Sequence, residues 1–230
     1  MEGIIPVAHI ENDFTGKFGI PRQSGMNGET VSRVVFEKRF ASPDAIRGIE
    51  GFSHLWLIWI FSENEGRENA SLTVRPPRLG GNTRVGVFAS RAPFRPNPIG
   101  LSCVKLMRVE YAENGAPVLY VAGADLMNGT PIADIKPYVP YTDCHPEASG
   151  GFSVDGEGHV LRVCWQCPVP EELPEDKKAA LDRVLSLDPR PSYQRDGREY
   201  GLSYAYFNVR FSVDGDTLSV LSVQREERGR

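Results

Sequence analysis

Two arginines and an asparagine lie in a proline-rich stretch, Ser90–Gly100, and residues of these types bind anionic and polar groups. Its three prolines fix φ and remove backbone donors, so the stretch is neither a helix interior nor a central strand. Residues before proline favour extended geometry, which predicts a stiff loop. The side chains that such a loop holds in place are those of Arg91, Phe94, Arg95 and Asn97. The pattern suits a binding site and is equally typical of a proline-rich surface turn.

Positive charge is concentrated around this loop. From Asn69 to Val109 there is no Asp or Glu, but seven residues are Lys or Arg. The whole chain has 26 Lys and Arg against 30 Asp and Glu, so the remainder has 19 against 30. A basic island in an acidic protein indicates a local site for an anionic partner, such as nucleic acid or a phosphorylated ligand. The island consists of Arg75, Arg78, Arg84, Arg91, Arg95, Lys105 and Arg108.

A second group of arginines, interleaved with tyrosines, lies near the C-terminus. This mixture suits single-stranded nucleic acid, because bases stack on aromatic rings while guanidinium groups meet phosphates. A tyrosine-rich sheet with one solvated face has the same composition, and both interpretations stay open. The group consists of Arg190, Tyr193, Arg195, Arg198, Tyr200, Tyr204, Tyr206 and Arg210.

Cysteine and histidine supply the residue types of a zinc site but not the spacing. Cys164 and Cys167 fall on an expected strand, and the upstream Cys144 and His145 are adjacent, so their side chains point apart. Ordinary thiols are therefore favoured, and we expect no metal. His54 begins a buried aromatic run, which favours a structural role. The chain has no G-x-S-x-G, Walker A or HExxH motif, and no catalytic residue can be named.

These residues must be positioned by strands. Six short hydrophobic runs, without amphipathic helices between them, predict a barrel or a sandwich. The apolar run that begins at His54 predicts a strand buried on both faces, although a short buried helix has the same pattern. No strand is followed by a Gly-rich turn and a long helix, which argues against a Rossmann site. The runs are Ile4–Ile10, Val31–Phe40, His54–Phe61, Thr83–Ala89, Leu101–Tyr111 and Val118–Ala124.

Composition changes after residue 141, where a linker rich in Gly, Ser, Asp and Pro is expected over 142–158. A small α+β domain over 159–230 follows the barrel domain of 1–141. Its one convincing helix, Glu171–Leu187, has acidic residues in the first turn and an apolar stripe. The expected strands of this domain are His159–Cys167, Tyr204–Val213 and Thr217–Val223.

Length and composition set the broader class. The 230 residues are 40% hydrophobic, which is enough for a packed core. No run approaches the roughly 18 apolar residues of a membrane span, and no signal peptide is visible. Four cysteines do not make a disulfide framework in a chain of this length. We therefore expect a cytoplasmic protein with no membrane partner.

Several long motifs together resemble the TsaA-like family, which includes the TrmO-type tRNA methyltransferases. They occur in the family's order over almost the whole chain, with Ala92 standing where the family often has Ser. The motifs are Pro21–Gln23, Phe52–Trp56, Thr73–Asn82, Phe94–Gly100, Gly129–Pro131, Asp134–Tyr138, Asp188–Tyr193 and Phe207–Arg210.

The resemblance implies a mainly β protein whose N-terminal barrel binds S-adenosylmethionine without a Rossmann domain, as a homodimer. It implies methylation of N6 of threonylcarbamoyl-adenosine beside the anticodon of tRNA. By motif match, the cofactor site is expected at Pro21, Arg22, Gln23, His54, Leu55, Arg91, Leu101, Gly123, Ala124, Asp125 and Leu126. The substrate is expected to contact Arg95, Asn97, Asp134, Tyr138, Arg190, Tyr193 and Arg195.

Methyl transfer needs mainly positioning and desolvation, because the methyl carbon is already activated by positive sulfur. Asp125 is a candidate partner for ribose hydroxyls or the amino group, and Arg91 or Arg22 for the carboxylate. The residue that takes the proton is not evident. Two other functions remain compatible with the sequence: a non-catalytic RNA-binding module, and a small-molecule methyltransferase of the same fold.

Overall fold

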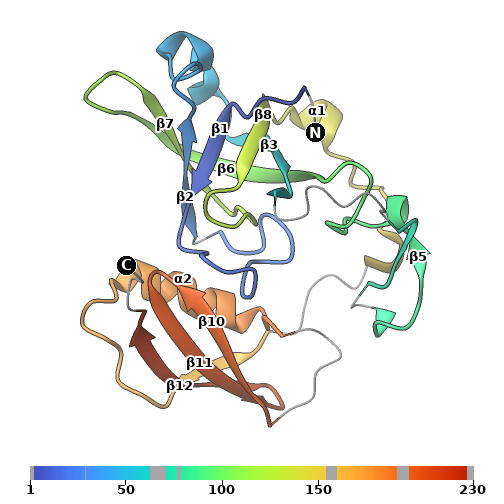
Figure 1. The fold of residues 1–230 in the computed structure, drawn as a ribbon, viewed down its shortest axis with the longest axis vertical. Helices are drawn as coiled ribbons and strands as arrows, with labels where there is room; N and C mark the ends of the chain where they lie inside the picture. The colour runs from blue at the N-terminus through green and yellow to red at the C-terminus, as the bar shows by residue number, and fades with distance from the viewer. Residues whose placement is uncertain are drawn as a thin grey trace.

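Six antiparallel strands close into a barrel in the order β1-β2-β7-β6-β3-β8 (Figure 1). The computed structural model describes residues 3–28, 30–62, 71–76, 79–153, 160–190 and 197–226. The fold is mainly β, as the sequence predicts. The barrel strands are β1 (Ala8–Glu11), β2 (Val31–Phe36), β3 (His54–Ile60), β6 (Ile99–Tyr111), β7 (Pro117–Ala122) and β8 (Pro131–Pro137).

The barrel interior is filled by alternate side chains of these strands. On β3, Leu55, Leu57 and Trp59 are buried, while His54 and Trp56 are partly exposed on the outer side. The expected strand is confirmed, but its burial on both faces is wrong. Because successive side chains of a strand point to opposite faces, a barrel wall buries one set and leaves the other at the outer surface.

The segment between β3 and β6 has little regular structure. The expected strand Thr83–Ala89 is shorter than predicted: only Val85–Gly86 (β5) is extended, pairing with Thr73–Val74 (β4). A 3₁₀ turn, Val87–Ala89, follows β5. The proline-rich stretch up to residue 98 then forms an irregular loop, as its prolines predict.

Short helical turns connect other strands. Ser42 caps a 3₁₀ helix over Pro43–Ile46, accepting a hydrogen bond from the backbone N–H of Asp44. This confirms the short helix expected there. The remaining short elements are Ile49–Gly51, α1 (Pro140–Asp143) and Gly151–Ser153.

A four-stranded sheet with one helix forms the C-terminal domain, in the order β10-β11-β12-β9. Only β9 runs parallel to its neighbour. The helix begins at Glu175, later than expected, because Pro174 occupies the capping position. Its apolar face, which includes Leu181 and Leu185, packs into the core of this sheet. The elements are β9 (Arg162–Trp165), α2 (Glu175–Ser186), β10 (Glu199–Tyr204), β11 (Phe207–Asp214) and β12 (Thr217–Arg225).

The segment after β1 joins the two halves of the molecule. Phe14 is buried in the C-terminal core, and Phe18 stacks on Tyr200 and Phe211 there. Nζ of Lys177 forms an ion pair with Oδ1 of Asp13 at 2.6 Å. In Figure 1 this blue segment descends from the barrel to the C-terminal domain, so residues from both halves lie beside the loop that follows it. No helix in the described part of the chain is long and apolar enough to cross a membrane.

Candidate functional site

The loop that contains Pro21, Arg22 and Gln23 lies against the turn after β7. The backbone N–H of Gly25 donates to the carbonyl oxygen of Gly123 at 2.8 Å. Gly123 has φ +81°, and a Cβ there would lie 3.2 Å from the Cα and N atoms of Gly25. Any side chain at 123 would therefore push these two segments apart. Glycine at 123 is required for the close approach of the two segments.

Arg91 connects the proline-rich loop to the same place. Its Nη1 donates to Oε1 of Gln23 at 2.6 Å, and the Gln23 side-chain amide donates to the carbonyl of Arg22. The loop is held by Arg95, which donates to the carbonyl of Ser90 at 3.0 Å. A stiff loop and a second, distant loop thus present polar groups side by side.

Asp125 supplies a carboxylate at this junction. Its Oδ1 accepts a hydrogen bond of 2.5 Å from the hydroxyl of Ser102, which itself accepts from Nε1 of Trp59 at 2.9 Å. Burial raises the pKa of Asp125 above its usual value. The hydrogen bond from Ser102 and the positive charge of Arg91 act in the opposite direction but do not cancel the effect of burial.

Arg22 points away from Gln23 towards the C-terminal domain. Its Nη2 donates to the carbonyls of Asp188, at 3.1 Å, and Arg190, at 2.5 Å. Asp188 has φ +50° and pairs with the Arg190 guanidinium at 2.9 Å. Arg190, which the sequence offers as a substrate contact, is only 9% exposed. Tyr193 and Arg195 lie outside the described residues.

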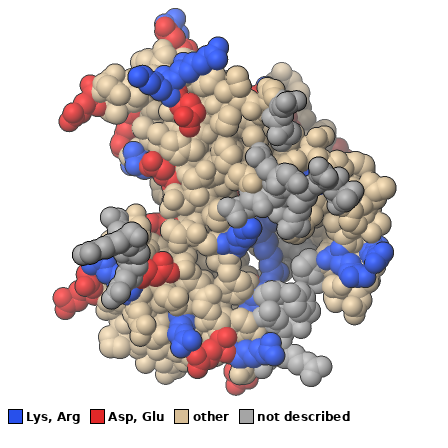
Figure 2. Space-filling model, viewed as in Figure 1, with Lys and Arg blue, Asp and Glu red and all other residues tan. Residues whose placement is uncertain are grey.

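Lys and Arg side chains gather in the hollow between the barrel, above, and the C-terminal domain, below (Figure 2). Arg22 and Arg91 come from segments that meet at this junction. Positive charge at the meeting point of two domains attracts an anionic ligand and raises its local concentration.

His54 and Tyr138 form a neighbouring cluster on the barrel wall. The backbone N–H of Tyr138 donates to the carbonyl of His54, and their ring centroids are 6.2 Å apart. Trp56 lies 5.7 Å from the Tyr138 ring. Asp134 pairs with Lys136 at 2.8 Å on β8. Asn97 uses its carbonyl to accept the N–H of Ile99, which closes the proline-rich loop.

Four of the expected cofactor residues are apolar, and three of these are fully buried while the fourth is half exposed. Leu55, Ala124 and Leu126 have 0% of their surface exposed and belong to the barrel core. Their side chains support the barrel wall, so a role in binding falls on their backbone atoms. Leu101 is half exposed and faces outward from β6. The structure therefore brings Arg22, Gln23, Arg91, Gly123 and Asp125 together and places Leu101 on the outer wall.

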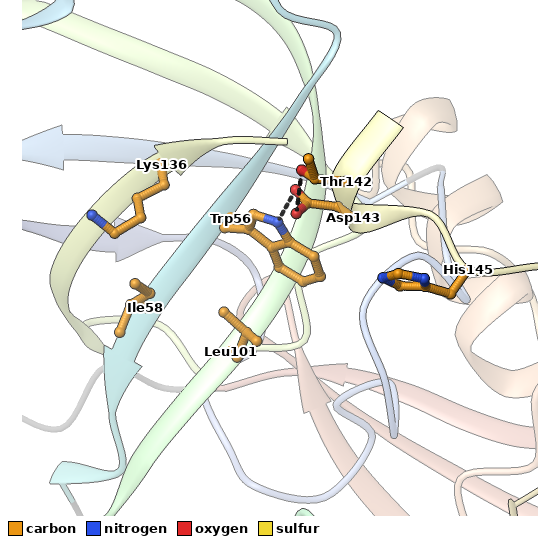
Figure 3. Close-up of a pocket in the computed structure, with 7 residues that line it drawn as sticks. All are labelled: Trp56, Ile58, Leu101, Lys136, Thr142, Asp143 and His145. Carbon is orange, nitrogen blue, oxygen red and sulfur yellow. Dashed lines mark hydrogen bonds between the residues drawn. The ribbon is translucent and has the colours of Figure 1, made fainter. Parts of the chain in front are cut away.

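Leu101 lines a cavity of about 390 Å³ on that outer wall (Figure 3). Trp56 lies in the middle of the residues that line it, and Nε1 of Trp56 donates to Oδ2 of Asp143 at 2.8 Å. That hydrogen bond, and a larger contribution from the backbone N–H of Val139, lower the pKa of Asp143. Neither Trp56 nor Asp143 is among the site residues expected from the sequence, although Trp56 ends the motif Phe52–Trp56 and occupies an outward position of an apolar strand. The lining is completed by Ile58, Lys136, Thr142 and His145.

Two family models match the chain. The N-terminal domain of tRNA-methyltransferase O matches residues 9–144, and the C-terminal domain of TrmO matches residues 159–226. The chain belongs to the tRNA-methyltransferase O family. The TsaA-like, TrmO-type resemblance that the motifs indicate is thereby confirmed.

Relatives of the TrmO family align over nearly the full length. A tRNA (adenine(37)-N6)-methyltransferase from Escherichia coli K12 is 38% identical over 226 residues, 94% of each chain. A Pseudomonas aeruginosa protein whose given name carries the words S-adenosylmethionine-dependent methyltransferase is 37% identical over 96% of each chain. The crystal structure of TrmO from Pseudomonas aeruginosa superposes with a TM-score of 0.76 at 31% identity, covering 98% of this chain and 97% of that one.

Proposed function

We propose that the chain transfers a methyl group from S-adenosylmethionine to N6 of threonylcarbamoyl-adenosine at position 37 of tRNA. Membership of the TrmO family supports the reaction class, and the Escherichia coli relative is named for the same position and atom. The observation that carries the proposal is the hydrogen bond between Arg91 and Gln23. It joins the Pro21–Gln23 motif to the proline-rich loop, in one polar site that also holds Asp125.

The donor groups at this site fit the cofactor. S-adenosylmethionine has a carboxylate, an ammonium, a sulfonium and ribose hydroxyls, and it supplies a methyl carbon activated by positive sulfur. Arg91 is a fitting partner for the carboxylate, and Asp125 for an ammonium or a hydroxyl. We propose that backbone atoms of Pro21–Gln23, of His54–Leu55 and of Gly123–Leu126 complete the pocket, and that Leu101 adds an apolar contact from the outer wall of β6.

The chain contributes orientation and exclusion of water. The close backbone packing of Gly25 on Gly123 leaves no room for solvent between these two segments. Groups fixed in this way lose little freedom when a ligand binds, so they can hold two reactants in line. Water exclusion also strengthens the interaction of Asp125 with a positive group.

We propose that the C-terminal domain and the basic island bind the anticodon loop. The boundaries of the two family models, 9–144 and 159–226, support a division into a catalytic barrel domain (1–141), a linker (142–158) and a tRNA-recognition domain (159–230). Arg22 ties the barrel side of the site to the segment that leads to Tyr193 and Arg195. The substrate contacts are proposed at Arg95, Asn97, Asp134, Tyr138, Arg190, Tyr193 and Arg195, in a homodimer acting in the cytoplasm.

The test uses purified protein, methyl-labelled S-adenosylmethionine and two tRNA preparations. One preparation carries threonylcarbamoyl-adenosine at position 37, and the other has unmodified adenosine there. Label is expected in the first alone, at N6 as located by nucleoside mass spectrometry. Arg91→Met is expected to lose most of this activity. Arg47→Met, at an exposed arginine paired with Asp44 far from the site, is the matched control and is expected to retain it.

Two outcomes contradict the proposal in different ways. Cofactor binding without methylation of either tRNA favours a small-molecule methyltransferase of the same fold. Binding of tRNA without any binding of the cofactor in a calorimetric titration favours a non-catalytic RNA-binding module.

A further inference from the structure

Ser102 occupies an unusual place, since it is a polar residue with 0% of its surface exposed inside the barrel. It lies on β6 between Gly100 and Val104, which also face inward. Its hydroxyl is within hydrogen-bond distance of two side chains, Nε1 of Trp59 at 2.9 Å and Oδ1 of Asp125 at 2.5 Å. No motif of the family resemblance includes Ser102 or Trp59.

The direction of these two hydrogen bonds follows from the groups themselves. An indole N–H can only donate, so the hydroxyl oxygen of Ser102 must accept from Trp59. The single hydroxyl proton of Ser102 is then donated to Asp125. Oδ1 of Asp125 therefore acts as an acceptor, and a hydrogen bond donated to a carboxyl oxygen stabilises the charged form more than the neutral one.

The indole of Trp59 is itself held rigidly. A Cβ at position 100 would lie 2.2 Å from the Trp59 ring, so the indole lies flat on the backbone of Gly100. The ring of Phe61 is 4.2 Å away, centroid to centroid. The glycine that ends the proline-rich motif thus makes space for the ring whose N–H orients Ser102.

We propose that Trp59 and Ser102 are positioning residues that hold Asp125 as a carboxylate, fixed in place for a hydroxyl or ammonium group of the cofactor. This rests on the proposed function as far as the ligand is concerned. The hydrogen-bond chain Trp59–Ser102–Asp125 exists independently of it.

Burial opposes the charged form of Asp125, and four groups support it. Ser102 donates from β6, the backbone N–H groups of Asp125 itself and of Ser24 donate as well, and Arg91 supplies positive charge from the proline-rich loop. Removal of the Ser102 hydroxyl takes away one of these contributions. The pKa of Asp125, already above its usual value, should therefore rise further.

The first experiment measures this titration without any ligand. Protein labelled with ¹³C at aspartate carboxyl carbons is titrated by NMR, and the Asp125 signal is assigned from its loss in Asp125→Asn. Ser102→Ala is expected to move the Asp125 midpoint to higher pH, and Ser102→Thr, which keeps a hydroxyl, to restore it. Trp59→Phe is expected to move it in the same direction by a smaller amount, because the hydroxyl then rotates freely.

Ser32→Ala is the matched control. Ser32 is also a buried barrel serine, and its hydroxyl has no hydrogen-bond partner within the described residues. This variant is expected to leave the Asp125 midpoint unchanged. An unchanged midpoint in Ser102→Ala, in protein that melts cooperatively, would overturn the proposal and leave Ser102 a packing residue.

The second experiment measures affinity for S-adenosylmethionine by calorimetry from pH 5 to 8. Ser102→Ala is expected to bind about tenfold more weakly at the acidic end of this range, the equivalent of about one pH unit, and to approach the wild type as the pH rises. A loss that is equal at every pH would overturn the charge-holding role. If the wild type binds no cofactor at any pH, the proposed function fails, whereas the NMR titration still decides whether Ser102 controls Asp125.

Discussion

Nη1 of Arg91 lies 2.6 Å from Oε1 of Gln23, although the two residues are 68 positions apart in the chain. One stands in the proline-rich loop and the other in the loop after β1. Because Gln23 also donates to the carbonyl of Arg22, the three residues form a continuous hydrogen-bonded chain. The chain continues through Arg22 to the C-terminal domain. The candidate cofactor site and the candidate tRNA-binding domain are therefore physically connected.

The Arg91–Gln23 pair should act as a unit in cofactor binding. Arg91→Met and Gln23→Ala are each expected to weaken binding of S-adenosylmethionine about tenfold, and the double variant by little more than either single one. Residues in direct contact are non-additive by about 0.5–3 kcal/mol. Calorimetric titration of the four proteins measures this. Strictly additive losses would show that the two side chains act separately.

Stability should hardly change in these variants. The contact is exposed, and exposed polar pairs contribute about 0.2–1 kcal/mol to folding. Urea unfolding of Arg91→Met is therefore expected to stay close to that of Arg47→Met, the distant control. A large drop in unfolding free energy for Arg91→Met alone would indicate a structural role for the proline-rich loop.

Arg22 is expected to hold the segment at 188–190 in place, in addition to its proposed role in the cofactor site. Its guanidinium donates to two backbone carbonyls there, and hydrogen bonds from charged groups contribute about 1.5–3 kcal/mol. Arg22→Met should weaken tRNA binding more than cofactor binding, because the segment at 188–190 loses its anchor. Filter binding with tRNA and calorimetry with S-adenosylmethionine separate the two effects.

Arg33→Met serves as the comparison for Arg22→Met. Arg33 is an exposed arginine of β2 that pairs with Glu11 at 2.6 Å on the barrel surface. The substitution Arg33→Met removes the same positive charge as Arg22→Met, but it does so on the barrel surface and leaves the C-terminal domain unchanged. Equal losses of tRNA affinity in both variants would mean that Arg22 acts through its charge alone.

Gly100 is intolerant of substitution, because the indole of Trp59 leaves no room for a side chain there. A methyl group at 100 would overlap the indole, and overpacking of a core typically costs about 1–3 kcal/mol. Gly100→Ala is expected near the upper end, about 3 kcal/mol in urea unfolding. Gly86→Ala is the control, because Gly86 has φ −61° and open space around its Cα. A Gly100→Ala protein as stable as Gly86→Ala would show that Trp59 can move away at no cost.

The barrel strands could be predicted from alternating and continuous apolar runs. Two features of the C-terminal domain could not: the turn between β10 and β11, and the hydrogen bond that this turn makes to the segment after β1. A single strand, Tyr204–Val213, is predicted where the chain turns back on itself between β10 and β11. The turn residues Ala205 and Tyr206 have φ +48° and +70°, a conformation normally signalled by Gly or Asn. The long-range hydrogen bond from Ala205 N–H to the carbonyl of Asp13 accompanies this turn. Local sequence carries no sign of such a contact.

The candidate site likewise contains residues that the sequence predicts and residues that it does not. Arg91, Gln23 and Asp125 are expected from motif resemblance, and the structure brings them together. Trp59 and Ser102 gave no signal, because they meet across 43 residues and only the closed barrel makes them neighbours. A serine in an apolar strand has no pattern that distinguishes a hydrogen-bonded positioning residue from a tolerated polar one. Only the pairing of β3 with β6 reveals it.

Asp125 should reduce stability at neutral pH, as buried site residues often do. Its pKa is raised in the folded state, so the folded protein binds the proton more tightly than the unfolded chain, whose carboxyl titrates near about 3.9. The charged carboxylate is therefore unfavourable above the folded-state pKa, and this cost disappears as the pH falls through the folded-state pKa towards the unfolded value. Asp125→Asn removes the charge but keeps an oxygen that can accept from Ser102.

We expect Asp125→Asn to unfold at higher urea concentration than the wild type at pH 7, and to lose this advantage as the pH approaches 4. Its affinity for S-adenosylmethionine should fall at the same time, since an amide cannot pair with an ammonium group as a carboxylate does. Urea titrations across this pH range and calorimetry at pH 7 measure the two effects. A variant that is less stable than the wild type at pH 7 would mean that hydrogen bonds to the carboxylate outweigh its burial, contrary to the raised pKa.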